Sequence, residues 1–216
     1  MNKKYLLFDL DGTITASDEG ITRSVQYALS KLGINEPDLQ KLKVFVGPPL
    51  RVAFPKYYGL SREQAEEAVT YYRKRYEDVG IFECTLYDGI KDLLHDCKAH
   101  GYTLVLATSK PRIYAHKILE RFGIHDCFSV VAGCELDGRL DSKAEVIAHA
   151  MSLCGDADKD KYIMIGDRFY DIEGANIMGL ESVGVLYGYG NKKELEDEGA
   201  THICENVSEL HSLLID

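Results

Sequence analysis

The stretch YTLVLATSKPRIYAHKILERFGIHDCFSVVA, residues 102–132, decides the fold of this chain. Its apolar run at 102–107 predicts a buried strand, residues 112–123 predict a helix, and the apolar run at 128–132 predicts a second strand. Gly123 stands where the end of that helix needs a left-handed cap. Two strands joined by a helix favour parallel pairing, because parallel neighbours need a crossover connection.

The same alternation extends on both sides of this stretch. Helices are predicted at 89–101, 142–154 and 171–179, and strands at 4–10, 162–165 and 182–186. We therefore expect an α/β fold with a doubly wound parallel sheet. Residues 16–84 differ, because they predict helices and no clear strand, with a capping box at Ser61 and Gln64. The expected organisation is a core of residues 1–15 and 85–216, with a helical subdomain of residues 16–84 inserted after the first strand.

Composition and charge limit the classes of function. With 216 residues, 45% of them hydrophobic and 28% charged, the chain suits one soluble domain plus a subdomain. Its formal net charge of −10 argues against nucleic acid as the main partner, but one local cationic site still suits a small phosphorylated metabolite. The apolar runs are too short to cross a bilayer and no secretory signal precedes the first strand, so we expect a cytoplasmic protein with no membrane partner. Six cysteines without CxxC spacing predict reduced thiols, not a zinc site.

The ligand site of such a sheet lies beyond the carboxyl ends of its strands. The residues that the sequence places there are Asp9, Asp11 and Thr13 after the first strand, Thr108, Ser109 and Lys110 after the strand at 102–107, Lys143 at a helix start, and Asp167 and Asp171 after the strand at 162–165. Asp9, Asp11 and Asp167 brought together form a carboxylate cluster that needs a compensating cation. Mg²⁺ is the natural choice, because it prefers oxygen ligands and keeps waters and substrate phosphate in its octahedron.

Each of these features alone has a purely structural explanation. Asp-x-Asp-Gly is a common turn, and Thr108 or Ser109 suits a helix N-cap. Lys143 suits a solvated charge at a helix start, and Asp171 suits a first-turn carboxylate favoured by the helix dipole. These explanations do not account for all four groups falling on the same edge of one sheet. The coincidence favours a functional site.

Together these residues resemble the haloacid dehalogenase superfamily of phosphohydrolases over essentially the whole chain. Residues 9–13, DLDGT, are similar to its first motif, Thr108 to the second, Lys143 to the third, and Gly166-Asp167 with Asp171 to the fourth. The helical insertion is similar to the superfamily's first type of cap. Residues 47–51, 166–175 and 184–190 resemble most the phosphoglycolate phosphatase group and its 5′-nucleotidase-like neighbours. One departure is the pair at 16–17, Ala-Ser, where related enzymes often carry Asp-Ser.

The resemblance implies a Mg²⁺-dependent phosphatase with an aspartyl-phosphate intermediate. It assigns Asp9 as the nucleophile, and Asp11 as the acid to the leaving group and then the base to water. It assigns the metal ligands to Asp9, the Asp11 backbone carbonyl and Asp167, with Asp171 as an outer anchor. The remaining assignments are Thr108 and the Ser109 amide to phosphoryl oxygens, Lys143 to charge neutralisation and Thr13 to the turn. Arg51 from the cap and Lys110 from the core are candidate contacts to the substrate, and the alternative for Arg51 is an exposed charge on a helix. The sequence leaves the substrate open between phosphoglycolate, a nucleoside monophosphate and a sugar phosphate.

Two other functions remain open from the sequence. A phosphomutase uses the same two aspartates but returns the phosphoryl group to a substrate. A non-enzymatic phospho-acceptor module, such as a response-regulator receiver, also phosphorylates an aspartate in a doubly wound sheet, although receivers are shorter and lack the helical insertion. A dehalogenase also uses the nucleophilic aspartate, but it has no need for Asp11 or for an acidic Mg²⁺ site, so the sequence argues against that function. The oligomeric state is left open between monomer and homodimer.

Overall fold

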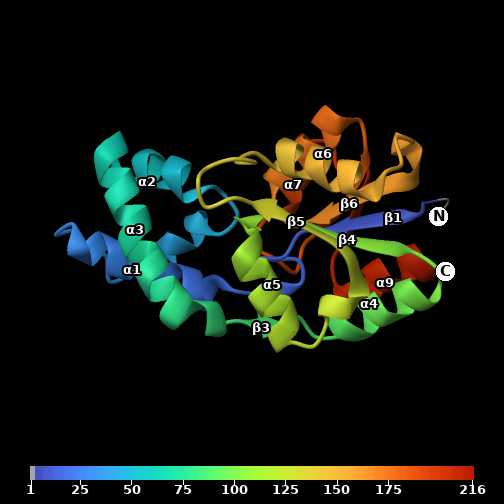
Figure 1. The fold of residues 1–216 in the computed structure, drawn as a ribbon, viewed down its shortest axis with the longest axis horizontal. Coiled ribbons are helices and arrows are strands. Elements are labelled where there is room, and N and C mark those ends of the chain that lie inside the picture. Colours follow the sequence, from blue (N-terminus) through green and yellow to red (C-terminus); the bar gives the residue numbers. More distant parts are fainter. Residues whose placement is uncertain (1–2) are drawn as a thin grey trace. The chain divides into compact units, whose positions relative to one another are not determined.

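A computed structural model describes residues 3–216 as two compact units (Figure 1). The first unit contains the chain up to Thr15 together with Leu86–Asp216, and the second contains Ala16–Thr85. The second crossing between the units therefore falls one residue later than the boundary expected from the sequence. The two units are described separately below.

The first unit is built on a six-stranded parallel sheet. Its strand order is β5-β4-β1-β6-β7-β8. The strands are β1 (Tyr5–Phe8), β4 (Thr103–Pro111), β5 (Phe128–Cys134), β6 (Tyr162–Gly166), β7 (Glu181–Val185) and β8 (His202–Cys204). Neighbouring strands pair in parallel throughout, so the doubly wound parallel sheet predicted from the sequence is confirmed. The sequence predicted no element beyond residue 186, and β8 is new.

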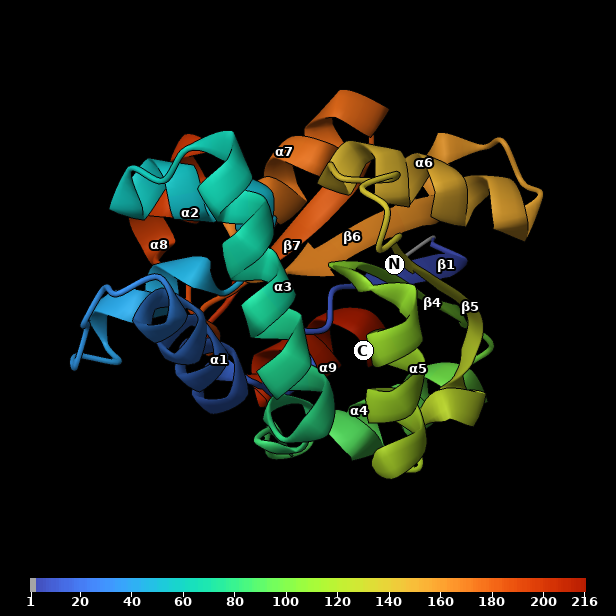
Figure 2. The same ribbon diagram turned by 60° about the vertical axis from the view of Figure 1, so that its left-hand side comes forward.

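Helices cover both faces of this sheet, as Figures 1 and 2 show. The helices are α4 (Ile90–Ala99), α5 (Arg112–Arg121), α6 (Lys143–Cys154), α7 (Phe169–Met178), α8 (Lys192–Asp197) and α9 (Val207–Ile215). Helices α6 and α7 lie on one face, and α4, α5 and α9 lie on the other. Burial on both faces explains why the central strands read as continuous apolar runs instead of alternating ones.

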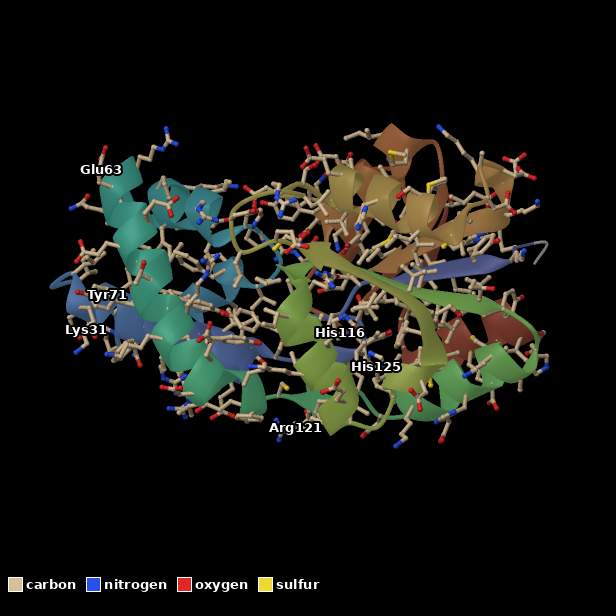
Figure 3. All side chains as sticks on the ribbon, in the orientation of Figure 1. Lys31, Glu63, Tyr71, His116, Arg121 and His125 are labelled. Carbon is tan, nitrogen blue, oxygen red and sulfur yellow. The ribbon has the colours of Figure 1, made fainter. Side chains whose placement is uncertain are left out.

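An apolar core lies between the sheet and helices α6 and α7. Leu7 and Met164 from neighbouring strands pack there with Val146 and Ile147 of α6. The Tyr5 and Tyr162 rings stack in the same layer with centroids 4.4 Å apart. On the opposite face, the η3 turn (His125–Cys127) follows α5, and Figure 3 shows His116 beside His125, whose ring nitrogens are 2.9 Å apart.

The second unit is helical, as predicted. It contains α1 (Asp18–Lys31), the turn η1 (Lys41–Phe45), α2 (Leu50–Tyr58), α3 (Arg62–Asp78) and the turn η2 (Gly80–Phe82). The expected capping box opens α3, with the Ser61 hydroxyl accepting from the Gln64 amide and the Gln64 side chain accepting from the Ser61 amide. Tyr72 and Tyr76 are buried and stacked, with ring centroids 5.3 Å apart. These two tyrosines therefore belong to the core of this unit, and Tyr71 on the same helix is half-buried (Figure 3).

One small element at the crossings was not predicted. Strands β2 (Thr15–Ala16) and β3 (Thr85–Leu86) form a separate two-stranded sheet where the chain leaves and re-enters the first unit. Strands of two residues leave no periodic signal in a sequence. Within residues 3–216, no helix is both long and apolar enough to cross a membrane, and none of the six cysteines forms a disulfide.

Candidate active site

The register of the sheet brings the polar residues of three strands to one edge. Phe8 of β1 is the partner of both Leu106 in β4 and Ile165 in β6. The next residue after Phe8 is Asp9, and its amide continues the ladder by donating to the Ile165 carbonyl at 2.9 Å. Residues that follow the three strands therefore converge at this edge, as the sequence predicted.

Three buried carboxylates lie together at this edge. Asp9, Asp167 and Asp171 each offer an oxygen within 4.8 Å of the others, and Asp167 and Asp171 are almost completely buried. Burial raises the pKa of Asp9 to about 6, with Lys143 opposing the shift and Asp171 adding to it. Burial and the charges of Asp171 and Asp9 raise the pKa of Asp167 well above its ordinary value. Burial and the neighbouring carboxylates therefore disfavour the charged forms of Asp9 and Asp167.

Lys143 is the cation that contacts this cluster. Its ammonium lies 2.9 Å from Asp9 Oδ1 and 2.7 Å from Asp171 Oδ1, and it donates to the Ala107 carbonyl at 3.2 Å. Burial acts to lower the pKa of Lys143, but the charges of Asp171 and Asp9 outweigh burial and raise it. Both Oδ1 atoms therefore contact the ammonium at hydrogen-bonding distance. Lys143 is placed at the first turn of α6, where the Ser142 N-cap and Glu145 form a capping box.

Glycines let the backbone approach Asp167 closely. Gly12 has φ +90°, and a Cβ on it would clash with the Asp167 carboxylate. A Cβ on Gly188 would clash with the Asp167 side chain, and one on Gly190 would clash with its carbonyl. This approach allows the Tyr189 amide to donate to Asp167 Oδ2 at 2.8 Å, while the Thr13 hydroxyl lies 3.5 Å from Oδ1. Thr13 therefore contacts an acidic side chain of the site from the turn that the sequence predicted it to shape.

Glu194 of α8 fastens the loop between β6 and α7, and the sequence analysis missed it. Glu194 Oε1 accepts from Arg168 Nε and from the Phe169 amide, both at 2.9 Å. Asp171 Oδ2 accepts from the Arg168 amide at 3.0 Å, so the loop that joins Asp167 to Asp171 is held from both ends. The sequence does carry the N-cap pattern Asn191-x-x-Glu194, but it gives no sign that Glu194 reaches another loop.

Asp11 takes a different partner from the other aspartates. Lys110 Nζ lies 2.7 Å from Asp11 Oδ1 and 2.5 Å from Oδ2, and both residues are buried. The sequence predicted a carboxylate cluster of Asp9, Asp11 and Asp167, and for Asp11 this is wrong, because its carboxylate pairs with Lys110 and the observed cluster is Asp9, Asp167 and Asp171. The Lys110 amide donates to the Thr108 hydroxyl oxygen at 3.2 Å. The structure therefore places Lys110, which the sequence assigned to the substrate, on Asp11.

The two remaining candidates are less deeply placed. Ser109 is half-buried directly after Thr108. Arg51 belongs to α2 of the second unit, where its Nε lies 2.6 Å from Glu66 Oε1 of α3. Arg51 therefore has an ion-pair partner within its own unit.

The donor set suits a hard divalent cation. The cluster consists of carboxylate oxygens, which Mg²⁺ prefers. Among the described residues, Lys143 is the ammonium that contacts these three buried carboxylates, and a divalent cation would neutralise negative charge that it leaves. The residues present therefore fit a magnesium site.

A sequence model of the haloacid dehalogenase-like hydrolases matches residues 6–185, which include every candidate residue of the core site. The chain belongs to this family. Among curated members it is 44% identical over 209 residues to a 5′-nucleotidase of Pseudomonas aeruginosa, covering 97% of this chain and 94% of that one. It is 37% identical over 210 residues to the tyrosine-protein kinase PtkA of Mycobacterium tuberculosis, covering 97% of this chain and 71% of PtkA.

Solved structures of the family share the fold. The crystal structure of a predicted phosphatase from Clostridium acetobutylicum superimposes with a TM-score of 0.96 at 46% identity, covering 99% of this chain and 98% of that one. The resemblance noted in the sequence is thus confirmed, and this haloacid dehalogenase-like hydrolase is a phosphoric monoester hydrolase.

Proposed function

We propose that this haloacid dehalogenase-like phosphatase hydrolyses small phosphate monoesters with Mg²⁺ and passes through an aspartyl phosphate on Asp9. The observation that carries the proposal is the buried cluster of Asp9, Asp167 and Asp171 around Lys143. Such a cluster is unfavourable in a purely structural role, because burial opposes every charge in it. With Mg²⁺ bound, such a cluster would bring a phosphate dianion to a carboxylate nucleophile.

The metal would be held by Asp9, Asp167 and the Asp11 carbonyl. Bound there, Mg²⁺ supplies positive charge that offsets the phosphate dianion and helps to orient it. Asp171 pairs with Lys143 at 2.7 Å, which supports its proposed role as an anchor of that lysine. Glu194, the Tyr189 amide and the glycines around Asp167 hold the ligand loop in place.

Asp9 is the proposed nucleophile. A carboxylate oxygen of Asp9 attacks phosphorus, the bond from phosphorus to the ester oxygen breaks, and Asp11 gives a proton to the departing alkoxide. In the second step Asp11 takes a proton from water, which attacks the phosphoryl group and regenerates the Asp9 carboxylate. Lys143, at 2.9 Å from Asp9 Oδ1, restricts rotation of the nucleophile and neutralises charge on the phosphoryl group.

Thr108 and Ser109 are the proposed donors to the phosphoryl oxygens. The Thr108 oxygen accepts from the Lys110 amide, which leaves its hydroxyl proton to donate to phosphate. The Ser109 amide follows it along the chain. We assign the choice of substrate to residues 16–84, the helical cap. Arg51 is the candidate contact, and it would have to break its ion pair with Glu66 to bind substrate.

Nucleoside monophosphates are the first substrate class to assay, because a 44% identical relative is named a 5′-nucleotidase. Phosphoglycolate and sugar phosphates complete the panel. The relative named a tyrosine-protein kinase makes transfer to an acceptor other than water the competing function. Release of inorganic phosphate with no accumulation of a phosphorylated acceptor identifies the hydrolase.

Metal removal tests the proposal directly. Protein treated with EDTA and passed into metal-free buffer should release no phosphate from any member of the panel, because the carboxylate cluster then repels the substrate dianion. Mg²⁺ should restore activity, and Ca²⁺ should depress it, because its larger and looser coordination misplaces the nucleophile. Malachite green detection of phosphate measures all three conditions.

The thermal unfolding temperature serves as the control for these assays. Mg²⁺ should raise it in the same concentration range that restores turnover, because a cation that binds only the folded state stabilises it. Full turnover by the stripped protein would remove the metal from the reaction.

A further inference from the structure

Lys110 and Asp11 form a buried ion pair in which the ammonium contacts both carboxylate oxygens. A lysine that served only to bind substrate would not need this geometry. The ammonium reaches both carboxylate oxygens, at 2.7 and 2.5 Å, and the side chains are only 11% and 4% exposed. Contact with both oxygens fixes the plane of the carboxylate as well as its position. We propose that Lys110 is a positioning residue that sets the orientation of Asp11 and acts on the reaction through Asp11, not through the phosphate.

Lys110 is itself held in place from several directions. Its amide donates to the Thr108 hydroxyl, and residues 108 and 110 share one face of β4 because side chains alternate along a strand. The pairing of β4 with β5 shifts register between Thr108 and Pro111. Gly133 of β5 permits this irregularity, since a Cβ there would lie 2.6 Å from the Lys110 carbonyl. The strand thus presents the ammonium at a fixed point.

The Asp11 end of the pair is equally fixed. The Ile14 and Thr15 amides both donate to the Leu10 carbonyl at 2.9 Å, and the Gly12 amide donates to the Thr15 carbonyl at 2.8 Å. This turn sets the direction in which the Asp11 side chain leaves the backbone. A short turn on one side and a strand on the other therefore leave the carboxylate little freedom while Lys110 is present.

The two buried lysines of the site divide the aspartates between them. Lys143 contacts Asp9 and Asp171, whereas Lys110 contacts Asp11. The carboxylate proposed as acid and base is thereby kept out of the cluster of the proposed nucleophile. Without Lys110, Asp11 would lose its fixed geometry and its nearest cation. The proposed function is the premise of this inference, because it gives Asp11 a leaving group to protonate.

The inference predicts that loss of Lys110 imitates loss of Asp11. We expect Lys110→Met to lower kcat for alkyl phosphates on the order of 10²-fold, a typical contribution of a general acid or base, with little change in KM. Formation of p-nitrophenol in a single turnover should fall about tenfold or less, because that leaving group departs without a proton. Lys110→Arg, which keeps a cation within reach of the carboxylate, should recover part of the alkyl phosphate activity.

A double-mutant cycle separates this role from direct phosphate binding. In an Asp11→Asn background, Lys110→Met should cost no more than about threefold, because residues that act as a unit are not additive. Lys117→Met, which removes an exposed lysine of α5, is the matched control and should change nothing. Far-ultraviolet circular dichroism and thermal unfolding check that each variant folds, and Lys110→Arg carries the test if Lys110→Met does not.

Two outcomes overturn the inference. Equal losses for both leaving groups with a raised KM, repeated in the Asp11→Asn background, would show that Lys110 holds the phosphoryl group directly. No loss in any variant would show that the ion pair is idle. Failure of the proposed function looks different, because Asp11→Asn protein would then form no phosphoenzyme on Asp9, whatever stands at position 110.

Discussion

Asp9→Asn should abolish phosphate release from every ester. The amide has nearly the shape of the carboxylate but is not a nucleophile, so neither chemical step can begin. We expect kcat to fall by about 10⁴-fold or more for alkyl and aryl phosphates alike, as for other enzymes that lose their nucleophile. Initial rates of phosphate release over the substrate panel measure this loss.

Asp126→Asn is the matched control for this variant, because it makes the same replacement of a carboxylate by an amide at a fully exposed residue on the η3 turn. It should retain wild-type rates. Substantial turnover by Asp9→Asn that still depends on Asp11 would mean that another group attacks phosphorus.

Asp167→Asn should remove Mg²⁺ binding while stabilising the metal-free protein. The amide can keep the contact with the Tyr189 amide but removes one of three clustered charges. We expect the unfolding temperature of the metal-free protein to rise by about 2–4 °C for each kcal/mol of repulsion that is removed. Stabilisation by Mg²⁺ and turnover should both be lost. Differential scanning fluorimetry with and without Mg²⁺ measures both effects on stability.

The stability gained by Asp167→Asn should depend on pH in a defined direction. In the folded metal-free wild type the pKa of Asp9 is raised to about 6 and that of Asp167 lies well above its ordinary value of 3.8. The folded state therefore binds protons more tightly than the unfolded state, and the buried charges destabilise it as pH rises through 6. The advantage of the variant should be largest at neutral pH and vanish near pH 4. An advantage that is independent of pH, or Mg²⁺ stabilisation equal to that of the wild type, would contradict the cluster as the metal site.

The elements that the sequence predicted carry a strong local signal, which is a continuous apolar run in the strands and a helical apolar period or a cap in the helices. Strands buried on both faces, such as Tyr162–Gly166, and helices with glycine or capping boxes at their ends, such as Lys143–Cys154, carry their signals locally. That Asp9, Asp167 and Asp171 lie at one edge also followed from the sequence, because parallel strands end at one edge, but the sequence placed Asp11 in the carboxylate cluster and the structure places Asp171 there instead. The sheet and most of the site could therefore be predicted.

What the sequence did not reveal depends on contacts between distant segments. The partner of Lys110 lies 99 residues away, so a charged residue after a strand gave no sign of whether it meets substrate or Asp11. Glu194 lies 25 residues from the Phe169 amide that it caps, in a helix of six residues with too little length for a period. Strand β8 spans only three residues and escaped prediction for the same reason. Such short elements are specified by packing instead of by local pattern.

The phosphoenzyme itself is the most direct test of the central claim that Asp9 carries the phosphoryl group. Asp11→Asn leaves Asp9 and Lys143 intact but removes the proposed base for hydrolysis, so p-nitrophenyl phosphate should phosphorylate the variant faster than water can release it. Rapid quench with intact-mass measurement should then show a burst of p-nitrophenol close to one per protein, together with one added phosphoryl group that peptide mapping places on Asp9. Slow, linear release of p-nitrophenol from Asp11→Asn with no added mass on Asp9 would contradict the account.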